Sequence, residues 1–178
     1  MDATTTFAVD ATLDLLARTP ATLRDQLRGL DADWTTARSD PESWNAFEVA
    51  CHLAYIEEHD WLVRVRMVVD EGTARAFPPV DHGDASFRYP GWSLDQVLGR
   101  FEELRRRNLD AVSALGIGPD LLDRRGLHPT LGEVSLRQLL ATWAVHDLNH
   151  LRQAQAAIAQ RYRDEVGPWR GSLGILDG

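Results

Sequence analysis

The chain has 178 residues, a length typical of one domain that buries its own core. Hydrophobic residues make up 44% and charged residues 26%, a composition that excludes a disordered or fibrous chain. With 19 basic against 27 acidic residues the net charge is -8, which repels a polyanion, so we expect no nucleic-acid partner. The basic run Arg105 to Arg107 is interpreted as a solvated helix face.

Membrane spans, export signals and disulfides are not expected. No run of eighteen apolar residues occurs, so no membrane span or membrane partner is predicted. The N-terminal residues lack the basic segment and apolar core of a secretory signal. The single cysteine, Cys51, excludes an intramolecular disulfide and a Cys-rich zinc site. We therefore expect one domain over residues 1–178, located in the cytoplasm.

The first arm of the chain is predicted to be helical. Apolar residues recur at helical spacing over residues 6–17. Thr19 and Pro20 then have the arrangement of an N-cap and a first-turn proline. A second helix through Leu30 is therefore expected, with a break near Pro20, followed by a loop over residues 31–43.

Three capping boxes mark the starts of later helices. Their residue pairs are Asn45 with Glu48, Ser93 with Gln96, and Ser135 with Gln138. The helices are expected to run to about residues 71, 115 and 161, with one short helical turn at 119–125 and a loop at 126–134. The Pro and Gly residues of 73–92 forbid a long regular element, and a loop of this length is often a lid over a pocket.

Four long helices with apolar stripes predict an all-α four-helix bundle, and metal sites are often built in the core of such bundles. The apolar residues of the tail after Gly167 are expected to dock on the body of this bundle.

Two histidines of the last helix have the spacing of a metal-binding pair. His146 and His150 lie in WAVHDLNHLRQ, a run without Gly or Pro, and four residues at ~100° each place both rings on one helix face. His52, on the helix that begins at Asn45, is the best placed third donor. Three imidazoles would leave a coordination position for water or substrate, as catalytic metal sites do.

Five further side chains are candidates for the pocket or for orienting the ligands. Glu48 lies one turn before His52, so a metal-site role competes with its capping role. The other four are near the histidines along their helices: Tyr55, His59, Asn149 and Gln153.

Three segments together resemble the DinB-like (YfiT-like) superfamily: PESWNAFEVACHLAYIEEHDW, HPTLGEVSLRQLLATWAVHDLNHLRQ and a tail with GPW. A His after W-x3-E-x3, followed later by H-x3-H, is much more specific than H-x3-H alone. The resemblance implies a metal-binding bundle, commonly a dimer, with His52, His146 and His150 as ligands. Members with known activity include thiol-dependent transferases and isomerases that use bacillithiol, mycothiol or glutathione, and others have been proposed as metal-dependent hydrolases.

These residues lead to a functional expectation. A three-His divalent metal lowers the pKa of a bound water to ~7, or deprotonates a coordinated thiol. Because Cys51 is rotated ~100° from His52 along the helix, any thiol should come from a small-molecule cosubstrate. We expect a homodimer that binds one divalent metal ion per chain, zinc or nickel, and activates a small-molecule thiol or water.

Other readings remain open. The chain could be a metal-dependent hydrolase, a non-catalytic metal-binding stress-response module, or a bundle with three structural histidines. A zincin-type protease is disfavoured because its motif is H-E-x-x-H, and Asp147 stands at the second position here.

Overall fold

The computed structural model describes residues 7–38, 41–83 and 85–177. Residue 6, at the predicted start of the first helix, and residues 39–40 and 84 of the predicted loops lie outside this part. The four longest helices are α1 (Val9–Leu27), α3 (Ala46–His59), α5 (Leu94–Ser113) and α7 (Leu136–Ala159). The shorter elements are α2 (Ala32–Thr35), α4 (Trp61–Asp70), η1 (Ser86–Arg88), α6 (Pro119–Leu122), β1 (Arg125–His128), β2 (Gly132–Ser135), η2 (Gln160–Tyr162), η3 (Gly167–Ser172) and η4 (Gly174–Leu176).

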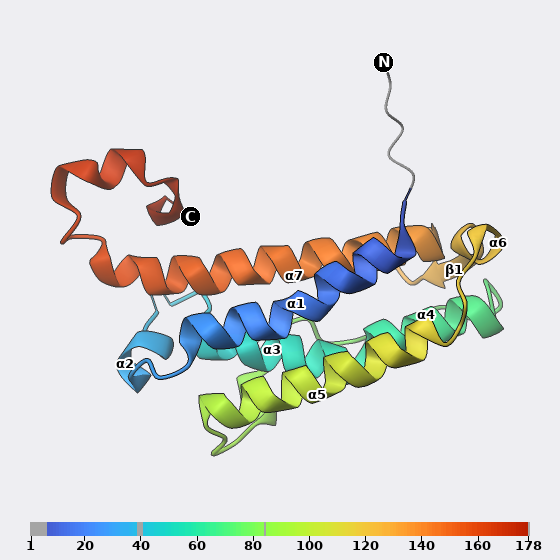
Figure 1. The fold of residues 1–178 in the computed structure, drawn as a ribbon, viewed down its shortest axis with the longest axis horizontal. Coiled ribbons are helices and arrows are strands. Elements are labelled where there is room, and N and C mark those ends of the chain that lie inside the picture. The colour runs from blue at the N-terminus through green and yellow to red at the C-terminus, as the bar shows by residue number, and fades with distance from the viewer. Residues whose placement is uncertain (1–6, 39–40, 84, 178) are drawn as a thin grey trace.

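The long helices form a bundle in which each packs against two others (Figure 1). Both α1 and α3 pack on α5 and on α7, so the helices close a ring in the order α1, α5, α3, α7. The predicted all-α four-helix bundle is confirmed. Its arrangement makes α3 the neighbour of α7, and these are the two helices that carry the predicted metal ligands.

All four long helices contribute fully buried apolar side chains to one core. They include Leu16, Leu23 and Leu27 of α1, Val49 and Ile56 of α3, Phe101 and Leu104 of α5, and Leu140 and Trp143 of α7. Burial of such side chains is the main favourable term in folding.

The three predicted capping boxes are confirmed. At the start of α3, Glu48 N donates to Asn45 Oδ1 and Asn45 N donates to Glu48 Oε2, both over 2.9 Å. Ser93 with Gln96 and Ser135 with Gln138 form the same reciprocal pairs at α5 and α7. Each box satisfies two backbone donors that the first helical turn leaves open.

The predicted break at Pro20 is wrong, because α1 continues through it. Proline lacks the N–H that would bond the carbonyl oxygen of Leu16 one turn earlier. In the structure Arg105 Nη1 donates to that oxygen over 2.7 Å. A donor from α5 thus replaces the missing helical hydrogen bond.

The single helix predicted from Asn45 to about Glu71 is also wrong, because it breaks at Asp60 into α3 and α4. Asp60 leaves the helical region of backbone space, with φ -122° and ψ -72°. Its carboxylate is buried and pairs with Arg64 one turn later. Beyond the break, α4 packs against β1, α5 and α7.

The loop predicted at 126–134 contains most of an antiparallel hairpin, β1 with β2. Gly126 permits it, because a Cβ at this position would lie 2.7 Å from Val68 Cγ2 and 2.8 Å from Phe77 Cζ. A residue without a side chain thus allows the strand to pack closely on its neighbours.

Four apolar side chains of the tail after Gly167 were expected to dock on the bundle. In the structure one of them does so. Leu176 is buried beside α7, whereas Trp169, Leu173 and Ile175 are exposed. Gln160 Nε2 also donates to the Leu176 carbonyl oxygen over 3.4 Å. In the part of the chain that the structure describes, none of the helices combines the length and the apolar character needed to cross a membrane.

Candidate metal centre

The three predicted histidines converge between α3 and α7. His52 Nε2 lies 3.2 Å from His146 Nε2, which lies 3.1 Å from His150 Nε2. The ligand atoms of the three residues all lie within 4.8 Å of one another, so they could hold a metal ion. Among the described residues no other group of three His, Cys, Asp or Glu side chains meets this condition.

The spacing of the nitrogens fits a divalent metal. Zinc–nitrogen bonds of about 2.05 Å place two nitrogens of a tetrahedral site about 3.3 Å apart, close to the distances found here. Without a shared proton or a cation, the lone pairs of these nitrogens would face one another. The donor set is therefore one that a metal ion would satisfy.

The ring of His52 is oriented by a backbone carbonyl. His52 Nδ1 lies 3.3 Å from the carbonyl oxygen of Gly83, to which it can donate its proton. This tautomer keeps the lone pair on Nε2, the atom that faces the other two histidines. The predicted loop over 73–92 thus reaches the site at Gly83.

Two tryptophans wall the site. The Trp44 ring stacks on His150 with centroids 5.8 Å apart and lies 4.8 Å from the His52 ring. Trp61, at the start of α4, meets the edge of His146 at 5.1 Å. Sequence analysis assigned neither residue to the site. For Trp44 the sequence holds a signal, because it is the Trp of the W-x3-E-x3 pattern that precedes His52.

The environment keeps two of the rings neutral. Burial, followed by the neighbouring His150 and His146 rings, lowers the pKa of His52 to about 3. Burial and His146 lower the pKa of His150 to about 4, although the Gln153 side chain acts in the opposite direction. Both imidazoles are therefore neutral at pH 7, the form that binds a metal.

The carboxylate of Glu48 bonds to Asn45 and Arg38 and not to the three histidines. One of its carboxylate oxygens closes the capping box at Asn45, and the other pairs with Arg38. Of its two predicted roles, the structure shows the capping role.

The remaining candidates differ in how they lie relative to the histidine cluster. Tyr55 packs on His59, with ring centroids 4.5 Å apart, and His59 is exposed. Asn149 is exposed on α7, and Gln153 is half-buried beside His150. Gln153 thus lies next to the cluster, whereas His59 is not one of the residues whose ligand atoms converge.

One of the three histidines is partly exposed on α7. His146 keeps 18% of its side chain exposed, whereas His52 is 1% exposed. His146 lines a depression of about 460 Å³ together with Ala141, Thr142, Val145 and Asn149. A small molecule in this depression would approach the ring of His146.

Comparisons with known proteins agree with this fold. YfiT from Bacillus subtilis, described as a probable metal-dependent hydrolase with an unusual four-helix bundle topology, matches with a TM-score of 0.71 and 18% identity over 93% of this chain and 92% of its own. TT2238, a four-helix bundle protein, matches with a TM-score of 0.58 and 24% identity over 83% of this chain and 98% of its own. These likenesses show the fold.

A comparison with curated proteins found no match. The model of the DinB superfamily matches residues 15–154, which include the three converging histidines. The chain therefore belongs to the DinB superfamily.

Proposed function

We propose that the protein binds one divalent metal ion per chain through the Nε2 atoms of His52, His146 and His150. The positions of these atoms carry the proposal, because His146 Nε2 lies 3.2 Å from His52 Nε2 and 3.1 Å from His150 Nε2, and the ligand atoms of all three residues lie within 4.8 Å of one another. The neutral state of His52 and His150 and the tautomer of His52 support it. Three imidazoles suit several metals, and zinc or nickel are the ones proposed.

We further propose that the protein is an enzyme acting on a small molecule. A bound divalent metal would supply a water or a thiol deprotonated near neutral pH. The chain's own residues would orient this chemistry: the Gly83 carbonyl holds the His52 tautomer, and Trp44 and Trp61 exclude water from two sides of the cluster. The substrate would lie in the depression beside His146.

Whether water or a thiol is activated depends on the cosubstrate. Cys51, the one cysteine of the chain, is fully buried, so a thiol would have to come from a small molecule. Such a thiol would make the protein a transferase or isomerase. Activated water would make it a hydrolase, and YfiT is described as a probable metal-dependent hydrolase. A homodimer stays a prediction from the resemblance, and a cytoplasmic location stays a prediction from the single cysteine and the N-terminal residues. Light scattering of the purified protein would measure the oligomeric state.

Elemental analysis tests the metal site. The purified protein should carry about one zinc or nickel ion per chain. A double variant, His146→Ala with His150→Ala, should carry almost none. Unchanged metal content in this variant would refute the site.

A turnover screen tests the chemistry. The metal-loaded protein is incubated with electrophiles and ester or amide substrates, each with and without low-molecular-weight thiols. Product that requires a thiol supports the transferase, and thiol-independent hydrolysis supports the hydrolase. Stoichiometric metal with no turnover in either arm would favour the non-catalytic module.

A further inference from the structure

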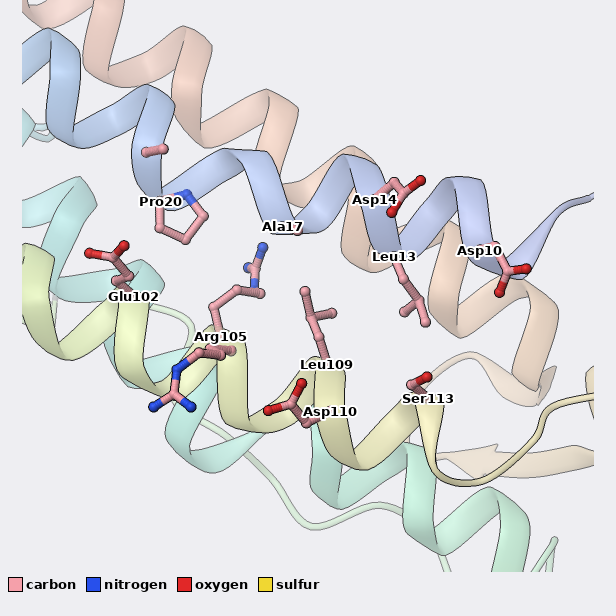
Figure 2. A pocket seen from close by; sticks show the side chains of 12 residues that line it. Asp10, Leu13, Asp14, Ala17, Pro20, Glu102, Arg105, Leu109, Asp110 and Ser113 are labelled. Carbon is pink, nitrogen blue, oxygen red and sulfur yellow. The ribbon is translucent and has the colours of Figure 1, made fainter.

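A charged side chain lies at the centre of the bundle. Arg105 is 1% exposed and extends from α5 toward α1, where it lines a cleft of about 530 Å³ with Ala17 and Pro20 (Figure 2). Sequence analysis interpreted Arg105 to Arg107 as a solvated helix face. That interpretation is wrong for Arg105, whereas Arg106 and Arg107 are exposed.

The guanidinium of Arg105 bonds to each of the other three long helices. Nη1 donates to the Leu16 carbonyl oxygen of α1 and, over 2.5 Å, to Asp147 of α7. Nη2 donates to Glu57 of α3 over 2.7 Å and to Asp147 over 3.1 Å. Arg105 therefore ties together all four helices that form the ring.

The two carboxylates come from the helices that carry the histidines. Glu57 lies five residues after His52 on α3, and Asp147 directly follows His146 on α7. Glu57 is held further by Trp143 Nε1, which donates to Oε1 over 2.9 Å. Each ligand-bearing helix thus contributes one acceptor to the same rigid guanidinium.

Stability alone does not explain this network. Removing three charges from water is costly, and hydrophobic replacements of buried ionic triads are often as stable or more stable. Buried ionic groups are better attested as devices that fix the register of packed helices. Because His52 lies on α3 and the other two histidines lie on α7, the register of α3 against α7 sets the distances between the three rings.

A slip in register would dismantle the cluster. Sliding one helix by one residue moves its side chains by about 1.5 Å along the axis. Metal ligands need placement within about 0.5 Å. The forked guanidinium, bonded to both carboxylates, resists such a slip because its hydrogen bonds have fixed directions.

We propose that Arg105 is a positioning residue for the metal site, which holds α3 and α7 in the register at which His52 meets His146 and His150. This role rests on the proposed binding of a metal by the three histidines. Arg105 contacts none of these rings in the described structure, so it acts through Glu57 and Asp147.

The test compares Arg105→Lys with Val112→Ala, a buried apolar position two turns further along α5. For each protein, zinc affinity is measured by competition, the Co²⁺ absorption spectrum is recorded, and the apo-protein is unfolded in urea. Lysine keeps the charge but cannot bond both carboxylates in fixed directions. Arg105→Lys should weaken zinc binding at least tenfold and alter the Co²⁺ spectrum. Val112→Ala should destabilise the apo-protein yet keep zinc affinity within threefold of wild type.

A second variant covers the case in which Arg105→Lys does not fold. The combined change Glu57→Leu, Arg105→Met and Asp147→Leu removes every charge of the network, so it should fold while losing zinc affinity by at least the same factor. Wild-type affinity and an unaltered Co²⁺ spectrum in the folded variant would overturn the positioning role alone. Equal affinity losses in Arg105→Lys and Val112→Ala would also overturn it. A wild-type protein that binds no metal would overturn the metal site and the positioning role together.

Discussion

His52 distinguishes a three-histidine site from a pair on α7. If it is a ligand, His52→Ala should weaken zinc and nickel binding by more than tenfold, since loss of a ligand should exceed the ~10- to 100-fold typical of groups that only orient one. His59→Ala is the matched control, seven residues along α3 and outside the cluster. It should change affinity less than about threefold, below ~1 kcal/mol. Titration of both variants measures this, and equal affinities for wild type and His52→Ala would refute the triad.

The lowered pKa values predict that acid destabilises the apo-protein. His52 and His150 have the ordinary value 6.5 when unfolded and values of about 3 and about 4 when folded, so between these limits the unfolded chain binds more protons. Their contribution to stability is complete above pH 6.5 and is lost as the pH falls toward about 3 for His52 and about 4 for His150, by up to about 1.4 kcal/mol per pH unit for each group.

Urea unfolding of the apo-protein between about pH 7 and pH 5 measures this effect. Glu57 and Asp60 titrate in the opposite sense, because burial raises the pKa of both carboxyls. The His52→Gln variant isolates one histidine and should show a shallower dependence on pH than wild type. Indistinguishable slopes would contradict the prediction.

The residues of the site that sequence could predict are those whose relation is local. Helical spacing places His146 beside His150, and the family-like motif adds His52. The contact of Gly83 with His52 depends on the path of a loop, and the contact of Trp61 with His146 depends on the break at Asp60. Residue spacing predicts neither of these. Arg105 was predictable, because it falls four residues after Phe101 on the buried stripe of α5. Its position on the stripe, and not its charge, predicts its burial.

At the level of elements, helix starts were predictable and helix interiors less so. The capping boxes are local patterns of two side chains, and all three occur as predicted. The strand at Gly126 depends on partners distant in sequence, namely Val68 and Phe77, and α4 beyond the break packs against β1 as well as against α7. Sequence spacing could not supply those partners.

Pro20 yields a prediction about α1. A proline inside a helix ordinarily costs about 3 kcal/mol, partly through a lost hydrogen bond. Here the Leu16 carbonyl oxygen already accepts from Arg105, so Pro20→Ala should change the free energy of unfolding by less than about 1 kcal/mol. Urea unfolding measures it. A gain near 3 kcal/mol would show that the proline strains α1.

Moving the proline by one position is the control for that measurement. In Pro20→Ala with Ala21→Pro, the carbonyl oxygen that loses its helical donor is that of Ala17, and Arg105 stays on Leu16. This variant should lose about 3 kcal/mol relative to Pro20→Ala. An equal stability of the two variants would mean that Arg105 does not compensate for the proline.

For the whole molecule, the apolar core and the histidine cluster are separate sources of stability. The core draws fully buried leucines and aromatics from α1, α3, α5 and α7. The cluster bridges α3 and α7. Zinc fingers unfold without metal because they lack such a core. This bundle should therefore keep its helices when no metal is bound.

Metal should nevertheless stabilise the fold, because the folded chain presents three converged nitrogens that the unfolded chain does not. At a free metal concentration about 1,000 times Kd, the free energy of unfolding should rise by about 4 kcal/mol. Urea unfolding with zinc and with a chelator measures the gain, and circular dichroism of the chelated protein should retain the helical signal. The variant His146→Ala with His150→Ala should show no gain at the same zinc concentration. Loss of the helical signal on chelation would make the metal a requirement for folding and would contradict an independent apolar core.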